Sequence, residues 1–353
     1  MTMRAALVGL AVAAAGCQTL FPLEDRPDGA VDAVRTARRR EITIEYGGSI
    51  PFADFPVSIV LEDDPDLAMH ALPDGSDIRF TTEAGELEAE IVGYDGGTLD
   101  AWVRLPMLNA SMPNTVWLEY GGAASADHGM VWDSAIYKAV WHLSGPSKNE
   151  EPDRSGHGYT ATTGGATAPA MMTAGRAGLA REFALGDAAF CTGSDMMLGI
   201  ESFSFAAWVK VPSDFPGPRG PLDAGGNLAE GFGLEVESAA WRARIRDSKG
   251  SSIELQQNVQ LGDGAWHQLV AVYDRSGDPE LRTYLDGGFL AKKPGTLDSV
   301  AARGTRKPCL GKTFLGALDE VRVYSVALDP QWIATEASNL ANRETFVVIG
   351  DPQ

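Results

Sequence analysis

From residue 41 onward, apolar and polar residues alternate in short runs that are separated by Gly, Pro, Asn and Asp. A period of two places successive side chains on opposite faces of a β-strand, and these separating residues favour turns. In the run 98–105, for example, Leu99 and Val103 fall on one face and Trp102 and Arg104 on the other. Similar runs lie at residues 41–46, 55–61, 77–82, 88–94, 98–105 and 115–120. Without a helical periodicity between them, they predict a small β-sandwich over residues 41–122.

The second half of the chain shows the same alternation, with runs at residues 181–190, 202–211, 231–236, 241–247, 251–257, 266–273, 281–285 and 317–324. The segment 203–209 is almost wholly apolar, which is typical of a strand buried on both faces. Asp286-Gly287-Gly288 predicts a hairpin turn. Asp329 before Pro330 predicts the N-cap and first residue of a short helix. We therefore expect a second all-β domain over residues 139–340, with a short helix near its C-terminal end.

Three segments of the first half, at residues 55–57, 71–80 and 97–103, carry a resemblance to a known family. They read Phe-Pro-Val, Ala-Leu-Pro-Asp-Gly-Ser-Asp-Ile-Arg-Phe and Gly-Thr-Leu-Asp-Ala-Trp-Val. This region resembles a bacterial domain of unknown function (family 2341) that commonly precedes laminin-G-like modules. In some proteins that domain accompanies proton-channel subunits of the ExbB/MotA type. The resemblance implies an exported domain and no particular activity.

The second half resembles the laminin-G-like, concanavalin A-type jelly roll. The resemblance rests on Asp-Arg-Ser-Gly-His-Gly at residues 153–158 and on the segments 203–210, 266–274 with 285–287, and 316–324. It implies a jelly-roll fold, and it implies that Asp153 and Asp319 stand where this fold often holds structural calcium. Calcium prefers six to eight oxygen ligands, often loop carboxylates and carbonyls. The alternative is that Asp153 forms an Asx-turn and that Asp319 caps a bend.

The N-terminus has the features of an export signal. Residues 1–17 contain Arg4, a short apolar run from Ala5 to Ala15, and Gly16-Cys17. The run is shorter than the roughly 20 residues that span a bilayer, so it predicts a secretory signal. Cys17 resembles the lipidated cysteine of a bacterial lipobox, and Gln18 after it implies the outer membrane. The alternative is a plain signal peptide with an incidental cysteine. Residues 18–40 lack apolar periodicity and predict a flexible linker.

Charge and cysteine content narrow the function classes. The net charge of −19 and the pI near 4.6 oppose nucleic-acid binding. The only basic run, Arg38-Arg39-Arg40, is best interpreted as a solvated stretch of the linker. The chain has no Cys-x-x-Cys pair, which excludes a zinc ribbon at the level of motifs. If Cys17 is lipidated, Cys191 and Cys309 remain as a possible disulfide pair or as two separately buried thiols.

Candidate catalytic and ligand-binding residues are few. Glycoside hydrolases of this fold need a pair of carboxylates, and the jelly roll lacks their Glu-x-Asp-x-x-Glu pattern. Glu86, Glu88 and Glu90 share one strand face by alternation, where a solvated face is the preferred interpretation. Among the tryptophans, Trp241 is the one candidate for a surface contact to a sugar, because Arg242 and Arg244 follow it.

Together these observations predict a noncatalytic lipoprotein of the cell envelope, held by a lipid at Cys17. Its jelly roll is expected to bind a polysaccharide, a glycoconjugate or an envelope protein. The alternative is a structural or assembly lipoprotein of an envelope complex, linked to ExbB/MotA-type systems. A divergent glycoside hydrolase ranks last.

Overall fold

The computed structural model describes residues 37–124, 129–132, 135–167, 170–171, 174–215, 217, 219–225 and 229–353. It confirms the all-β class with short helices. The predicted signal and lipobox with Cys17, and the linker up to residue 36, lie outside the described residues. Within the described part of the chain, no helix is both long and apolar enough to cross a membrane.

Two facing sheets form a first sandwich from residues 38–120 together with residues 347–349. The first sheet has the order β26-β1-β7-β3-β4, and the second has the order β2-β6-β5. The bounds are β1 Arg38–Ile44, β2 Phe52–Leu61, α1 Pro65–His70, β3 Arg79–Thr82, β4 Gly85–Glu86, β5 Ala89–Asp95, β6 Thr98–Leu108, β7 Asn114–Tyr120 and β26 Val347–Ile349. Alternation is clearest in β7, where every second side chain from Asn114 to Tyr120 is buried.

The basic run corrects one sequence-based expectation. Arg38, Arg39 and Arg40 belong to β1, so the first strand begins inside the predicted linker. Arg40 is 7% exposed, forms an ion pair with Asp64 at 2.8 Å and donates to the hydroxyl of Tyr120 at 3.1 Å. Arg39 stacks on the ring of Trp117 at 3.5 Å. The arginines therefore contact neighbouring residues of the sandwich. Because all three are charged, apolar alternation does not mark the first three residues of β1.

A short helix, α1, also departs from the expected all-strand pattern. Asp64 caps it by accepting from the backbone N–H of Leu67 at 2.7 Å, and Pro65 occupies its first turn. This is the same Asp-Pro signature that predicts the helix at residue 330. Only Leu67 is buried in α1, so no apolar periodicity marks it in the sequence.

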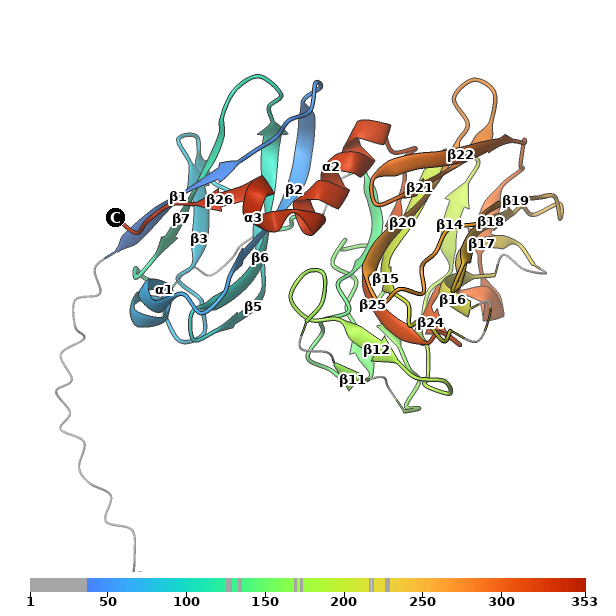
Figure 1. Cartoon of the computed structure of the whole chain (residues 1–353), viewed down its shortest axis with the longest axis horizontal. Coiled ribbons are helices and arrows are strands. Elements are labelled where there is room, and N and C mark those ends of the chain that lie inside the picture. Colours follow the sequence, from blue (N-terminus) through green and yellow to red (C-terminus); the bar gives the residue numbers. More distant parts are fainter. Residues whose placement is uncertain are drawn as a thin grey trace, which may run out of the picture. The chain divides into compact units, whose positions relative to one another are not determined.

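The strand β26 returns the chain to the first sandwich, where it lies beside β1 (Figure 1). The register pairs Ile42 with Ile349 and Ile44 with Val347. The predicted domain boundaries, 41–122 and 139–340, left this strand unassigned. The first sandwich is thus built from two separate stretches of sequence.

Residues 137–324 form a second sandwich. One sheet has the order β19-β18-β17-β16-β24-β13-β10-β9, and the other has the order β11-β12-β25-β15-β20-β21-β22, with β8 also paired to β25. A further pair joins β14 to β23. The bounds are β8 Tyr137–Trp141, β9 Glu150–Glu151, β10 Ala161–Thr162, β11 Ala170–Met171, β12 Arg181–Phe183, β13 Phe190–Thr192, β14 Met196–Gly199, β15 Phe203–Lys210, β16 Arg219–Ala224, β17 Gly231–Glu237, β18 Ala240–Arg246, β19 Ser252–Gln257, β20 Trp266–Asp274, β21 Glu280–Leu285, β22 Gly288–Pro294, β23 Val300–Ala302, η1 Gly304–Arg306, β24 Cys309–Lys312 and β25 Gly316–Tyr324.

Two local predictions for this half are confirmed. Asp286 and Gly287 connect β21 to β22 with φ angles of 50° and 82°, as a two-residue hairpin turn with positive φ at both positions requires. The helix α2, Pro330–Ala341, is capped by Asp329, which accepts from the backbone N–H of Gln331 at 2.7 Å. A second short helix, α3 (Arg343–Phe346), leads from α2 to β26.

The strand β15 explains its almost wholly apolar sequence by contacting two cores. Phe205 and Val209 pack into the core between the two sheets of the second sandwich. Ala206 and Trp208, on the opposite face, pack into a core shared with α2 and the first sandwich. Asn339 of α2 also pairs with β2 along its edge. Its amide accepts from the N–H of Ser58 at 3.2 Å and donates to the carbonyl of Pro56 at 3.1 Å.

Candidate functional site

Asp153 was the first candidate calcium ligand, and its surroundings do not fit that role. Its Oδ1 accepts from the N–H groups of Val140 at 3.1 Å and Ser155 at 2.9 Å, and from the Ser155 hydroxyl at 2.7 Å. Its Oδ2 accepts from the N–H of Tyr159 at 2.9 Å. Both oxygens therefore face hydrogen-bond donors, whereas a cation would need them free. The carboxylate ties the loop to β8, which is the Asx-turn alternative.

Asp319 lies in β25 and is fully buried. Its Oδ2 accepts from the N–H groups of Arg176 and Ala177, the latter at 3.0 Å, and its Oδ1 accepts from the N–H of Glu320 at 2.8 Å. Burial and the neighbouring Glu320 charge raise the pKa of Asp319. No group of three or more His, Cys, Asp or Glu side chains within the described ranges is arranged to hold a metal ion. The geometry of neither aspartate fits the expected calcium site.

Trp241 was expected as a possible surface contact to a sugar, and this expectation is wrong. Its side chain is 1% exposed and belongs to the core of the second sandwich. It lies in β18, where alternation places Trp241 toward the core and Arg242 and Arg244 on the opposite face of the strand. The two arginines form ion pairs with Glu235 of the neighbouring strand β17. They therefore do not indicate a sugar-binding face.

Cys191 and Cys309 are directly opposite each other in the pair formed by β13 and β24, and they form a disulfide in the structure. The bond joins positions 118 residues apart in the sequence. It crosslinks two short strands of one sheet, so it pins the middle of that sheet.

The three glutamates of residues 86–90 do not share a solvated face. Glu86 is exposed, but the Glu90 side chain is only 14% exposed. Glu90 accepts from Nε1 of Trp132 at 2.7 Å and pairs with Arg154 at 3.1 Å and with Nε2 of His142 at 3.3 Å. Burial alone would raise the pKa of Glu90, but the charges of His142 and Arg154 outweigh it and lower that pKa. The interpretation as a solvated face is therefore corrected for Glu90.

Glu90 belongs to a buried ionic cluster that joins the two sandwiches, made of Glu90, His142, Glu320, Arg322 and Glu336. His142 contacts Glu320 at 2.7 Å, and Arg322 contacts Glu320 at 2.6 Å and Glu336 at 2.8 Å. The Arg322 guanidinium lies 4.7 Å from the ring centres of both Trp102 and Trp132. Because its charges are mutually paired, the cluster holds β5, the residue after β8, β25 and α2 together.

Beside this cluster lies a cavity of about 630 Å³, here called the Asp100 pocket. This volume falls within the range of about 300–1,000 Å³ that is common for ligand pockets. Its polar lining comes from both sandwiches and from α3: Glu62, Asp63, Tyr94, Asp95, Thr98, Asp100, Ser144 and Arg343. Apolar side chains, including Val92, Leu99 and Leu179, complete its wall.

Asp100 is the unusual residue of this pocket. Asp100 lies in β6 and is 8% exposed. Its Oδ1 has no hydrogen-bond partner among the described residues. Burial raises the pKa of Asp100 to about 6, although the nearby charge of His142 acts in the opposite direction. Gly178, with φ of +58°, forms the wall against it, and a Cβ there would lie 1.9 Å from Oδ2. The absence of a side chain at Gly178 thus leaves room beside the Asp100 carboxyl.

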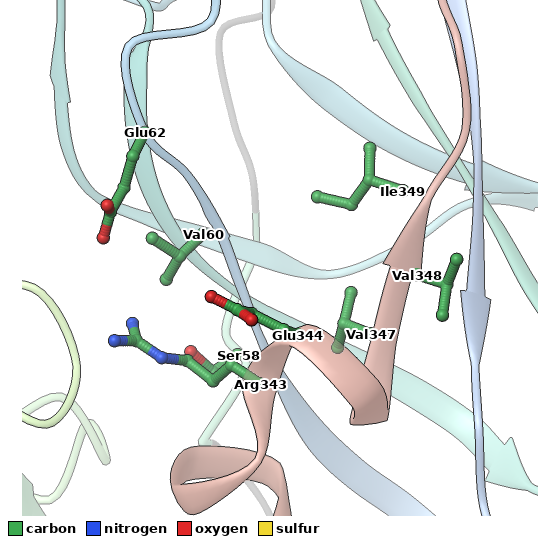
Figure 2. Close-up of a pocket in the computed structure, with 8 residues that line it drawn as sticks. All are labelled: Ser58, Val60, Glu62, Arg343, Glu344, Val347, Val348 and Ile349. Carbon is green, nitrogen blue, oxygen red and sulfur yellow. The ribbon is translucent and has the colours of Figure 1, made fainter.

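A second, smaller hollow of about 450 Å³ adjoins the first and shares Val60, Glu62 and Arg343 with it. Figure 2 shows the guanidinium of Arg343 extending away from Val347 and Val348. Arg343 has no ion-pair or hydrogen-bond partner within the described part of the chain. Arg343 lines both hollows, and its guanidinium is available as a donor.

Sequence reasoning did not single out Asp100 or Arg343. Asp100 lies in the run 98–105, on the face that it shares with Trp102. A fully buried tryptophan on the face expected to be polar was the signal that this side of β6 is covered by another part of the chain. Arg343 follows α2, outside the region predicted as either domain.

Comparison with known proteins finds a matching family model for part of the chain. Residues 185–334 match the model of the concanavalin A-like lectin/glucanases superfamily. No curated protein matches the chain. Among solved structures, the binding domain of Paraclostridial Mosquitocidal Protein 1 is 13% identical, with a TM-score of 0.47, over 59% of this chain and 53% of that one.

Another similar structure is a botulinum neurotoxin serotype D ligand binding domain in complex with N-acetylneuraminic acid, at 13% identity and a TM-score of 0.44. That match covers 57% of this chain and 50% of the other. The chain thus spans about half the length of these solved structures. Together with the two-sheet sandwich, the family match shows that residues 185–334 form a concanavalin A-like lectin/glucanase domain.

Proposed function

We propose that this protein is an exported, noncatalytic glycan-binding protein, anchored to the bacterial outer membrane by a lipid on Cys17, whose ligand occupies the Asp100 pocket. The observation that carries the proposal is the buried carboxyl of Asp100, whose Oδ1 has no hydrogen-bond partner among the described residues and which lines a cavity of about 630 Å³. Buried polar groups in proteins nearly always have partners, and an unsatisfied one costs about 1–3 kcal/mol. A ligand hydroxyl would remove that cost.

The lining suits a sugar. Carbohydrates present hydroxyl groups, which donate to carboxylates and accept from guanidinium groups, and C–H faces, which pack on apolar and aromatic walls. Asp100 supplies the acceptor, Arg343 the donor, and Leu179 and Tyr94 the apolar surface. The match of residues 185–334 to a superfamily of lectins and glucanases supports the same ligand class.

The binding test uses purified full-length protein on an array of polysaccharides and glycans, with Asp100→Asn and Tyr94→Ala beside the wild type. Asp278→Asn serves as the matched control, because Asp278 is exposed and lies outside the pocket. We expect binding by the wild type and the control and its loss in both pocket variants. Release of reducing sugar from any bound glycan would contradict the noncatalytic part of the proposal. Binding that survives in both pocket variants would contradict the site.

The anchor is tested separately. Metabolic labelling with a fatty acid that carries an alkyne should label the wild type and leave Cys17→Ser unlabelled. Cys17→Ser should also move from the membrane fraction to the soluble fraction. Equal labelling of both proteins would contradict lipidation at Cys17.

A further inference from the structure

The charges around the Asp100 pocket narrow the class of glycan that it accepts. Four acidic side chains line it, Glu62, Asp63, Asp95 and Asp100, against the single basic side chain of Arg343. Arg343 also lines the adjoining hollow, beside Glu62 and Glu344. The interior of the pocket is consequently negative, within a chain whose net charge is −19.

The buried carboxyl adds a second, independent observation. Asp100 has lost most of its water, and no donor of the chain replaces that water at Oδ1. Two cations act on Asp100 through charge alone: His142, which is already paired with Glu320 and Glu90, and Arg343, which forms no hydrogen bond or ion pair with it. A ligand cation placed in the pocket would face an acceptor that has no competing partner. Charge-assisted hydrogen bonds of this kind are about twice as strong as neutral ones.

We infer that the Asp100 pocket selects a glycan that carries a free ammonium group, an amino sugar of the glucosamine type, with the ammonium group at Asp100. This inference rests on the proposed function and names its ligand class. The apolar wall of Val92, Leu99 and Leu179 packs against the ring, while the acidic rim disfavours sugars that carry carboxylates.

The test compares three trisaccharide probes by isothermal titration calorimetry with the full-length protein: the glucosamine trimer, the N-acetylglucosamine trimer and the galacturonic acid trimer. At about pH 6.5 the amines carry protons and Asp100, with a pKa near 6, is mostly ionised. We expect the glucosamine trimer to bind at least about tenfold more tightly than its N-acetylated form, and the acidic trimer not to bind. The preference should weaken as salt is raised, because salt screens the charges.

The variants locate the selectivity. Asp100→Asn keeps the size of the side chain and should abolish the preference for the free amine, while Asp278→Asn should keep it. Equal binding of the glucosamine and N-acetylglucosamine trimers would overturn the inference and leave glycan binding intact. Preference for the galacturonic acid trimer would overturn it by showing that Arg343 governs selection. Binding of none of the three would also overturn it, and the glycan array would then decide whether the proposed function stands.

Discussion

Nδ1 of His142, directly after β8, lies 2.7 Å from Oε1 of Glu320, in β25, and both side chains are almost completely buried. Glu90, from the first sandwich, contacts the other ring nitrogen at 3.3 Å. Burial on its own lowers the pKa of His142, but the charges and hydrogen bonds of Glu320 and Glu90 outweigh it and raise this pKa to about 10. His142 is therefore a cation at neutral pH, and it joins carboxylates of the two sandwiches.

This pair predicts how stability depends on pH. The pKa of His142 lies near 6.5 in the unfolded chain and near 10 in the folded one, so the folded state binds the proton more tightly. The resulting stabilisation is complete below pH 6.5 and is lost as the pH rises through about 10. Calorimetric unfolding should show the difference between the wild type and His142→Gln shrinking over this range.

The matched control is His157→Gln, since His157 is exposed. It should follow the wild-type profile throughout. At neutral pH, His142→Gln should lower the free energy of unfolding by about 3–5 kcal/mol, because it removes the buried cation that Glu90 and Glu320 share. A difference that stays constant from pH 6 to pH 10 would contradict a protonated His142.

Asp100→Asn should stabilise the protein. The pKa of Asp100 is about 6 in the folded state against an ordinary value of 3.8, so the folded state binds this proton more tightly. The favourable contribution is present below pH 3.8 and is lost as the pH rises through 6. Above pH 7 the ionised carboxyl therefore costs up to about 3 kcal/mol, which the asparagine removes.

Chemical denaturation at pH 5 and pH 8 measures this effect. The gain from Asp100→Asn should be larger at pH 8. Combined with loss of glycan binding, it would show a residue kept at the expense of stability, as is common in binding sites. A variant that is less stable than the wild type at pH 8 would indicate that Asp100 has a structural partner.

Asp153 predicts an outcome for metal removal. Its four hydrogen bonds come from the loop itself and from β8, so a chelator should leave the thermal midpoint of the wild type unchanged. Asp153→Ala should lower the free energy of unfolding by about 1–3 kcal/mol, because partly buried N–H groups lose their acceptor. Asp278→Ala is the exposed control. Stabilisation of the wild type by added calcium, absent in Asp153→Ala, would refute this role of the loop.

The disulfide between Cys191 and Cys309 predicts a redox effect. Replacing both residues with serine should lower the free energy of unfolding by about 2–5 kcal/mol in urea denaturation. A reductant should destabilise the wild type by a similar amount and have no effect on the double variant. A reductant that acts equally on both proteins would show that the effect comes from elsewhere.

The sequence predicted the parts of the fold that depend on local alternation. The strands around Leu118 and Phe205 and the helix capped by Asp329 lie where the pattern placed them. The inward orientation of Trp241 follows from the same alternation. The neighbouring arginines instead favoured the interpretation that Trp241 lies on a polar surface. Local patterns thus predicted the strands, but they did not always predict which side chains are exposed and able to bind a ligand.

The candidate site could not be predicted in the same way, because its residues meet only after long-range packing. Glu90 and His142 are 52 positions apart, and His142 and Glu320 are 178 apart. No period in the sequence records such a pairing. Asp100 looks like an ordinary polar residue of an alternating strand until the second sandwich covers that face. The three residues of β26 are too few for an alternation signal.

The pairing of β26 with β1 has a consequence for how the protein folds. The edge of the first sheet is completed by residues synthesised about 300 positions after β1, so the whole second sandwich must be made before this contact can close. The second sandwich is, topologically, an insertion within the first. We therefore expect the two to gain their full stability together, with the first sandwich remaining incomplete on the ribosome until the final strand emerges.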